Sequence, residues 1–282
     1  MSTQIAEVRP SPIAGLWYTG NESRLRSQIT AYLDDALIPD LPGEVVALVS
    51  PHAGHRYSGR TAGHAFAAVR GQAPELVVVV SPMHAPHPAS LLTTAHRAYA
   101  TPLGAMPVDK PAVERLAQFL GQSGLELTPV ANDGEHSLEI LLPFLQVALA
   151  KPFQLLPVMV RSQSPRTAQM LGKALAQTVQ GHSCLLVAST DLSHFYPEEV
   201  ANQLDGEMLR RLKSFDPDDL FAAEHSGKGF ACGVGAVAAV LWAARSLGAN
   251  TVEVLHHSTS ADETGDRASV VGYGAAAVLK AL

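Results

Sequence analysis

Histidine side chains follow three predicted strands at their carboxyl ends. His52 and His84 each come shortly after a Ser-Pro step that ends an apolar run, and Asp191 and His194 follow a third run. Ligands of open α/β sheets bind beyond the carboxyl ends of the strands. Proline stiffens the segment that aims the imidazole, as a metal site or a general base requires. Alternatively, these histidines could simply lie in polar loops that tolerate them. That explanation is less convincing for three strand ends together than for any one of them.

Cys232 is a second candidate for chemistry. It lies between Phe230-Ala231 and Gly233, just ahead of a predicted apolar helix. A helix N-terminus lowers the pKa of a thiol and favours the thiolate that binds metal or reacts, whereas a small buried hydrophobe is the usual fate of a free cysteine. Cys184, the second of two cysteines, lies inside an apolar run and is assigned no role. A disulfide framework is therefore not expected.

An acidic segment at residues 133–139 opens another predicted helix. Asp133 and Ser137 could both cap this helix, and Glu135 and Glu139 would favour the positive end of its dipole. Capping leaves His136 unexplained. We expect His136 to line a pocket, with a solvated loop position as the alternative.

The other histidines receive no site assignment. His64 lies on the first predicted helix, and His256 and His257 alternate along a late strand. Because successive side chains of a strand point to opposite faces, at most one of this last pair is expected to face a pocket. His55 and His87 could neighbour the site.

Short, continuous apolar runs rich in valine and leucine predict strands that are buried on both faces. These runs cover residues 45–50, 76–81, 154–160 and 183–189, and later strands are predicted at 252–258 and 269–277. Three- and four-residue apolar spacing predicts helices at 59–70, 110–122, 137–150, 165–179, 198–213, 217–224 and 234–247. This alternation predicts a three-layer α/β fold, with a largely parallel or mixed central sheet flanked by helices.

Bulk composition narrows the class of protein. Residues 1–282 are predicted to form a single domain, because 47% of them are apolar, only 16% are charged, and no linker interrupts them. A net charge of −6 without runs of Lys or Arg argues against nucleic acid as a partner. Neither a secretory signal nor an apolar stretch of about 20 residues is present, so we expect a cytoplasmic protein without membrane contact. Homo-oligomer formation stays open.

Ordered motifs make the chain resemble the Memo family, whose bacterial and archaeal members include protein B of the AmmeMemoRadiSam system. The motifs are AGLWYTG (14–20), PHAG (51–54), PMH (82–84), EHSLEILLPF (135–144), STDLSHF (189–195) and CGVG (232–235). The resemblance covers nearly the whole chain. It implies a fold similar to that of the class III extradiol, or LigB-like, dioxygenases, which are non-haem iron enzymes.

The resemblance also implies a ligand set for a metal ion. His52, His84 and Cys232 correspond to the metal-ligand positions of the family. Two imidazoles and a thiolate form a softer set than the two imidazoles and carboxylate of the dioxygenases. Iron or copper is the expected ion, and zinc also suits these ligands.

Further pocket residues follow from the same resemblance. Asp191 and His194 match pocket positions of the family, and His194 resembles the acid/base histidine of the dioxygenases. His136 matches the histidine of the EHS motif and is grouped with these two as a catalytic candidate. Trp17 and Tyr18 belong to the WYTG signature and are expected to wall the pocket.

Three functions from different classes remain in view. The leading interpretation is a metal-dependent oxidoreductase, dioxygenase-like, with redox or oxygen-linked activity. The second is a non-enzymatic binding protein that uses the same pocket for a peptide or a small molecule. The third is a zinc-dependent hydrolase in which His194 or Asp191 shuttles the proton.

Overall fold

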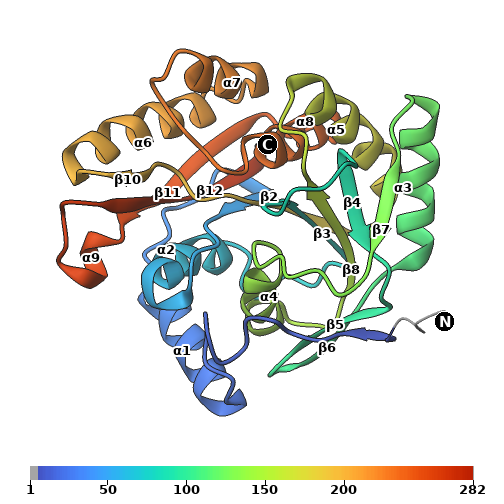
Figure 1. The fold of residues 1–282 in the computed structure, drawn as a ribbon, viewed down its shortest axis with the longest axis horizontal. Helices are drawn as coiled ribbons and strands as arrows, with labels where there is room; N and C mark the ends of the chain where they lie inside the picture. Colours follow the sequence, from blue (N-terminus) through green and yellow to red (C-terminus); the bar gives the residue numbers. More distant parts are fainter. Residues whose placement is uncertain (1–5, 282) are drawn as a thin grey trace.

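A mixed β-sheet forms the centre of the molecule (Figure 1). The structure, a computed structural model, describes residues 6–281. Within that range the nine strands of this sheet are, in spatial order, β10 (His194–Tyr196), β12 (Val270–Ala281), β2 (Gly43–Ser50), β9 (Cys184–Ser189), β3 (Leu76–Pro82), β8 (Gln154–Val160), β4 (Leu91–Thr94) and β7 (Leu127–Val130), with β11 (Thr251–Thr259) paired to β12. Strands β2, β9, β3 and β8 are parallel to one another, so their carboxyl ends lie along one edge of the sheet.

The central strands are apolar because both of their faces are covered. Every residue of β3 is buried, and four consecutive valines supply its interior. β-branched side chains pack well on a pleated surface, which favours the strand conformation here. Two large apolar clusters, one on each face of the sheet, complete the core. The predicted doubly buried strands are confirmed.

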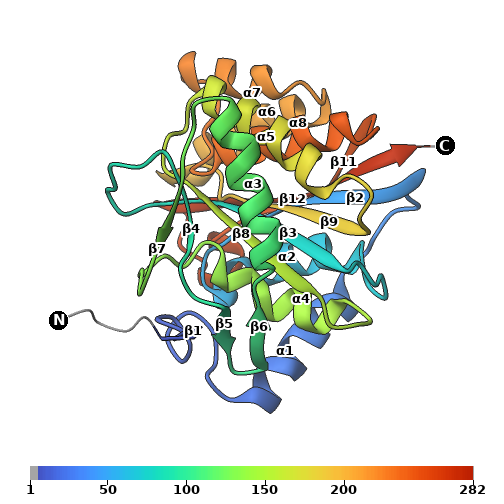
Figure 2. The same ribbon diagram turned by 90° about the vertical axis from the view of Figure 1, so that its right-hand side faces the viewer.

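Helices cover both faces, which gives the predicted three layers (Figures 1 and 2). One face carries α1 (Glu22–Asp35), α2 (His55–Ala67), the short 3₁₀ helix η1 (Glu139–Leu141) and α4 (Leu142–Ala148). The other face carries α3 (Lys110–Gln122), α5 (Pro165–Val179), α6 (Glu198–Lys213), α7 (Pro217–His225) and α8 (Val234–Ser246), while α9 (Ala261–Thr264) follows β11. None of the helices within residues 6–281 combines the length and the apolar character that crossing a bilayer demands.

The structure departs from the predicted elements in several places. The helix predicted over 137–150 is shorter: it begins as η1 and continues as α4, with Pro143 in the first turn of α4. Proline has no N–H to donate, so a regular helix cannot run through this position from residue 137. The sequence also did not predict the helices α1 and α9, the strands β4, β7 and β10 of the central sheet, or the small sheet of β1 (Val8–Arg9), β5 (Ala98–Thr101) and β6 (Gly104–Pro107). Most of these strands are too short to show a pattern.

Glycine allows α5 and α8 to pack closely. A Cβ atom at Gly172 would lie 2.4 Å from the Cβ of Trp242 and 2.6 Å from the carbonyl oxygen of Ala239, both on α8. Backbone atoms cannot give way as a flexible side chain can. The contact between these two helices therefore depends on the missing side chain.

Gly172→Ala is expected to lower the free energy of unfolding by about 1–3 kcal/mol, because the added methyl overpacks the α5–α8 contact. Gly206→Ala in the exposed part of α6 is the matched control, since nothing lies within 4 Å of its added Cβ. The control should raise stability by about 0.5–1 kcal/mol through the higher helix propensity of alanine. Urea unfolding curves of both variants test this, and equal changes would contradict the close approach.

Candidate functional site

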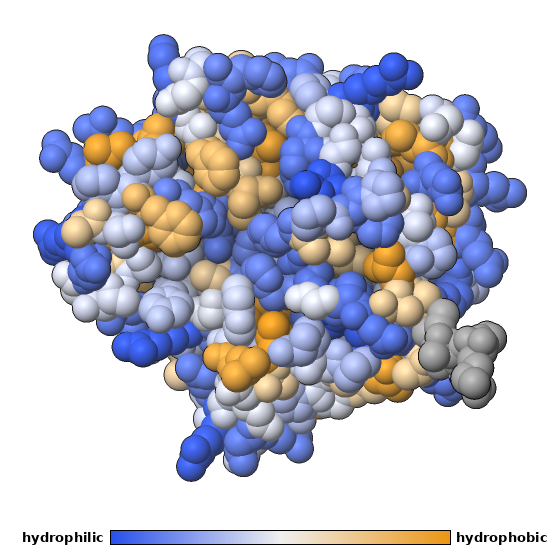
Figure 3. All heavy atoms as spheres, viewed as in Figure 1, coloured by the Kyte–Doolittle hydropathy of each residue, from blue (hydrophilic) through white to orange (hydrophobic). Residues whose placement is uncertain are grey.

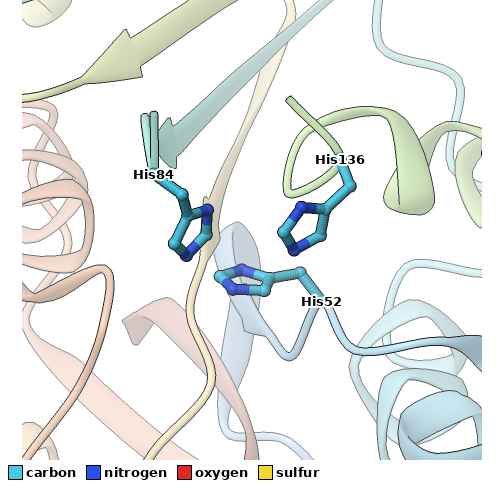
Figure 4. Close-up of side chains that lie close together, drawn as sticks. All are labelled: His52, His84 and His136. Atoms are coloured by element: carbon cyan, nitrogen blue, oxygen red, sulfur yellow. The ribbon is translucent and has the colours of Figure 1, made fainter. Parts of the chain in front are cut away.

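Three imidazole rings from distant parts of the chain converge at the carboxyl edge of the sheet (Figure 4). Donor atoms of His52, His84 and His136 all lie within 4.8 Å of one another. The His84 and His136 rings are stacked with centroids 4.9 Å apart, and the His52 ring meets both of them edge-on. These three side chains form a group that could hold a metal ion.

The sheet brings the first two rings together. His52 follows β2 and His84 follows β3, and β9 lies between these two parallel strands. Ser50 pairs in register with Ser189, so β2 and β9 end level with each other. The prediction that strand ends present histidines to one place is confirmed for this pair. His136 joins them from the loop before η1.

Glu135 fixes the orientation of His84. Its Oε1 accepts a hydrogen bond from Nδ1 of His84 at 3.0 Å, and its Oε2 accepts one from the backbone N–H of the same residue at 2.7 Å. Oε1 also accepts the backbone N–H groups of His136 and Ser137. Burial by itself would raise the pKa of Glu135, but these donors lower it below the ordinary carboxyl value, and Glu135 in turn raises the pKa of His84.

The capping roles predicted for the 133–139 segment are wrong. Neither η1 nor α4 has a side-chain cap. Ser137 donates its hydroxyl to the carbonyl of Pro82, while Asp133 and Glu139 form buried ion pairs with Arg9. These polar groups are drawn into long-range contacts because the loop that carries them is itself buried against β1 and β3.

Ser189 fixes the protonation of His52. The Ser189 hydroxyl donates to the carbonyl of Ser137, so it accepts from Nδ1 of His52 at 2.9 Å. Nε2 of His52 consequently carries the lone pair, and the sulfur of Cys232 lies 3.2 Å from it. Burial, followed by the charges of His136 and His84, lowers the pKa of His52 well below its ordinary value. His52 is therefore neutral at physiological pH.

Cys232 lies beside His52 but outside the group of three imidazoles. Its Sγ is 3.2 Å from Nε2 of His52 and accepts the backbone N–H of Asp191 at 3.2 Å. Burial, with the Asp191 carboxylate next in effect, raises the pKa of the thiol. The lowered thiol pKa expected from the start of α8 is therefore wrong for this environment, since desolvation outweighs the helix terminus.

Asp191 and His194 occupy different places around the centre. Asp191 is buried, and its Oδ1 accepts the backbone N–H of His52 at 2.7 Å. His194 is half-buried between Phe195 and Phe230, and its Nδ1 donates to the carbonyl of Leu192 at 2.7 Å. Nε2 of His194 is thus left free to accept a proton.

Aromatic side chains surround the centre. The Trp17 ring packs on His136 with centroids 4.1 Å apart, as expected for a pocket wall. Tyr18 instead is buried and donates its hydroxyl to Glu139. Phe195 is 74% exposed and has a φ of +64°, an uncommon conformation for a residue with a side chain. Figure 3 shows apolar surface on either side of a polar centre.

The remaining neighbours named from the sequence stay outside the group. His55 is buried, and its Nε2 pairs with the carbonyl of Ile140, while His87 accepts the backbone N–H of Ala89. Ser189 and the anchoring role of Glu135 were missed. Their presence inside the STDLSHF and EHSLEILLPF motifs was the available signal.

Comparisons with known proteins bear on this arrangement. The model of the Memo-like protein family matches residues 9–277. The chain belongs to the Memo family. A MEMO1 family protein of Nitrosopumilus maritimus is 32% identical over 272 residues, covering 95% of this chain and 98% of that protein. A MEMO1 family protein of Thermotoga neapolitana is 34% identical over 277 residues, covering 94% and 98%.

A solved structure supports the fold. An uncharacterized protein of Escherichia coli K12 superposes on this Memo-family chain with a TM-score of 0.54 at 16% identity, covering 83% of this chain and 99% of that one. At this identity the likeness concerns architecture alone. It agrees with the α/β fold predicted from the sequence.

Asp205 supports the segment that carries Asp191 and His194. Its fully buried carboxylate accepts the backbone N–H of Ser193 at 2.9 Å through Oδ1, and pairs with Nε2 of His257 at 2.9 Å through Oδ2. Gly272 leaves the room that this carboxylate fills, because a Cβ there would lie 1.8 Å from Oδ2.

Asp205→Ala should destabilise the protein by about 1–3 kcal/mol, because it leaves the buried N–H of Ser193 without an acceptor. Glu199→Ala, at an exposed position of the same helix, is the control and should change stability much less. Thermal unfolding of the two variants measures the difference. Matching values would show that the Asp205 carboxylate does not support this segment.

The raised pKa of Asp191 predicts how the stability of chelator-treated protein changes with pH. Burial raises its pKa to about 7, opposed by the N–H of His52, whereas an unfolded Asp ionises near pH ~3.9. Because the folded pKa is the higher one, the stability that this group contributes is present at low pH and is lost as pH rises toward 7. Between pH ~3.9 and pH 7, the free energy of unfolding of the wild type should fall by on the order of 4 kcal/mol relative to that of Asp191→Asn. Parallel stability curves from urea unfolding would rule this out.

Proposed function

We propose that this Memo-family protein is a metal-dependent oxidoreductase that holds a redox-active iron or copper ion at the histidine centre. The observation that supports it most directly is the convergence of His52, His84 and His136, with the sulfur of Cys232 adjoining His52. His52 is buried, His136 is half-buried and His84 is exposed, and their donor atoms lie close enough together for one ion to bind all three. A metal ion is the ligand that this chemistry favours.

The donor set fits a transition metal. Burial lowers the pKa values of His52 and His136, the latter to about 4, so both rings are neutral and can coordinate at physiological pH. Nδ1 of His52 is committed to Ser189 and Nδ1 of His84 to Glu135. Metal-binding histidines commonly use their second ring nitrogen in this way, which fixes the tautomer and directs the other nitrogen at the ion.

We assign His52 and His84 as metal ligands whether the third ligand is Cys232 or His136. Cys232 is the third ligand by resemblance to the family, and His136 is a further nitrogen donor brought close by the fold. Imidazole and thiolate donors suit iron, copper or zinc and disfavour magnesium or calcium. Metal binding would deprotonate the thiol, whose pKa is otherwise raised by burial.

The bound ion would supply one-electron chemistry and an open coordination position for an exogenous ligand. Two side chains of the protein, Asp191 and His194, would donate and accept protons. Asp191, with a pKa of about 7, can hold or release a proton within the physiological range. His194 offers Nε2 as a base, because Nδ1 donates to Leu192 and burial lowers the pKa of the ring.

Aromatic walls define how a ligand would approach. Trp17 covers His136, and Phe195 and Phe230 flank His194, each partly exposed. These rings offer apolar contact to a small molecule or a peptide side chain.

Metal content of anaerobically prepared protein tests the ligands. His84→Ala should lose most of the bound iron or copper, and Cys232→Ser should lose at least about tenfold in affinity, since each removes a donor atom. His225→Gln, on α7, serves as a control that should bind as the wild type does. Equal metal content in the wild type and Cys232→Ser would end the assignment of the sulfur.

Oxygen uptake by the metal-loaded protein tests the reaction class. We expect consumption with iron or copper in the presence of a reductant, and a strong decrease for His194→Gln because the base is removed. Hydrolysis of esters with zinc and no oxygen uptake would favour the hydrolase. Protein that binds no metal in any preparation would favour a binding protein.

A further inference from the structure

Arg161 follows strand β8 at the same edge of the sheet as the histidine centre. Val160, the last residue of β8, pairs in register with Pro82 and accepts the backbone N–H of Met83 at 2.9 Å. Arg161 therefore lies beside the segment that leads directly to His84. It belongs to none of the sequence motifs and is not one of the metal donors.

Main-chain hydrogen bonds hold Arg161 in place. Its N–H donates to the carbonyl of Ser90 at 2.9 Å, and the N–H of Ser162 donates to the same carbonyl at 3.1 Å. Ser90 is the last residue of the loop that carries His84, between β3 and β4. These two bonds fasten the loop after β8 to the loop after β3, so the backbones of Arg161 and His84 are fixed relative to each other.

The guanidinium of Arg161 lacks a protein partner. The residue is half-buried, and among residues 6–281 its side chain forms no ion pair and no hydrogen bond. Arg9, which is fully buried, instead pairs with Asp133 and Glu139. A guanidinium presents five N–H donors in a planar fork that matches a carboxylate or a phosphate. Arg161 therefore has donors available for a ligand.

The charge of Arg161 reaches the histidine centre. The hydrogen bond with Glu135 raises the pKa of His84, while burial and the charge of Arg161 act against this rise. Salt screens charge effects over about 10 Å in water. The guanidinium consequently lies near the His84 ring, as the position of its backbone beside Met83 allows.

The carboxylates of the centre leave this positive charge unpaired. Glu135 and Asp191 are both buried. Glu135 accepts hydrogen bonds from His84, and Asp191 accepts one from the backbone of His52. Neither carboxylate bonds to Arg161, and a bound metal ion would add further positive charge. A ligand that approaches His84 is therefore favoured if it carries a negative charge.

An apolar wall lies on the other side of the imidazoles. Trp17 is 38% exposed and packs on His136, and the His136 ring stacks on that of His84. A ligand that covers these two imidazoles can contact an indole ring through its body and the guanidinium of Arg161 through its acidic group. This combination suits a small molecule with an apolar body and one anionic group.

We propose that Arg161 binds the carboxylate of the substrate, so that the histidine centre acts on small apolar or aromatic carboxylic acids. A single guanidinium matches the one charge and the two oxygens of a carboxylate, whereas a phosphate monoester carries nearly two charges at neutral pH. The inference rests on the proposed function in that it names the substrate class of the same centre. Binding of the acid itself needs no redox-active ion.

NMR titration of the full chain with benzoate, and with benzamide as its uncharged analogue, tests the role of Arg161. Chelator-treated protein is used, so that the carboxylate cannot bind to a metal ion instead. The wild type should bind benzoate more tightly than benzamide. Arg161→Gln should weaken benzoate by at least about tenfold, because charge-assisted hydrogen bonds are lost, and should leave benzamide unchanged.

Two further variants separate the fork from its charge. Arg161→Lys keeps the charge but cannot bond both oxygens in parallel, so its affinity for benzoate should fall between those of the wild type and Arg161→Gln. Arg166→Gln, at an exposed position in the first turn of α5, removes the same charge five residues further along the chain. This control should bind benzoate as the wild type does.

Equal affinity of the wild type for benzoate and benzamide would overturn the proposal, as would wild-type affinity for benzoate in Arg161→Gln. Tighter binding of phenyl phosphate than of benzoate would overturn the choice of a carboxylate. Metal content is measured separately: protein that binds no metal yet selects benzoate through Arg161 would contradict the proposed function alone. Protein that binds metal without this selectivity would contradict the role of Arg161 alone.

Discussion

The carboxylate of Glu135 joins two loops that are far apart in the sequence. It accepts both Nδ1 and the backbone N–H of His84, 51 residues away, and at the same time the N–H groups that follow it in its own loop. A buried carboxylate is stable only when its oxygens are satisfied in this way. The orientation of His84 and the position of His136 therefore both depend on a single side chain.

A second layer of buried charge holds Glu135 in place. Arg9 of β1 pairs with Asp133 and Glu139 on either side of that residue, and donates to the carbonyl of Glu135 itself. Removing one partner of such a network leaves an uncompensated buried charge, which is costly. The N-terminal strand thus contributes to the geometry of a centre to which it supplies no donor atom.

Much of this was predictable from sequence, for identifiable reasons. Continuous valine runs marked the buried strands, and position after a strand marked His52 and His84, because both signals are local. The partners of Glu135 and the place of His136 beside those rings depend on contacts across the sheet, so local rules suggested a helix cap instead.

Strand β12 has a consequence for how the chain assembles. Strand β12 (Val270–Ala281) is synthesised after all three strands with which it pairs, β2, β10 and β11. During synthesis β2 must therefore wait, with its outer edge open, until β12 emerges from the ribosome. Such late, long-range pairing is slow and exposes strand edges to association. Chaperone dependence during translation would follow from the order of the strands, independent of any chemistry at the centre.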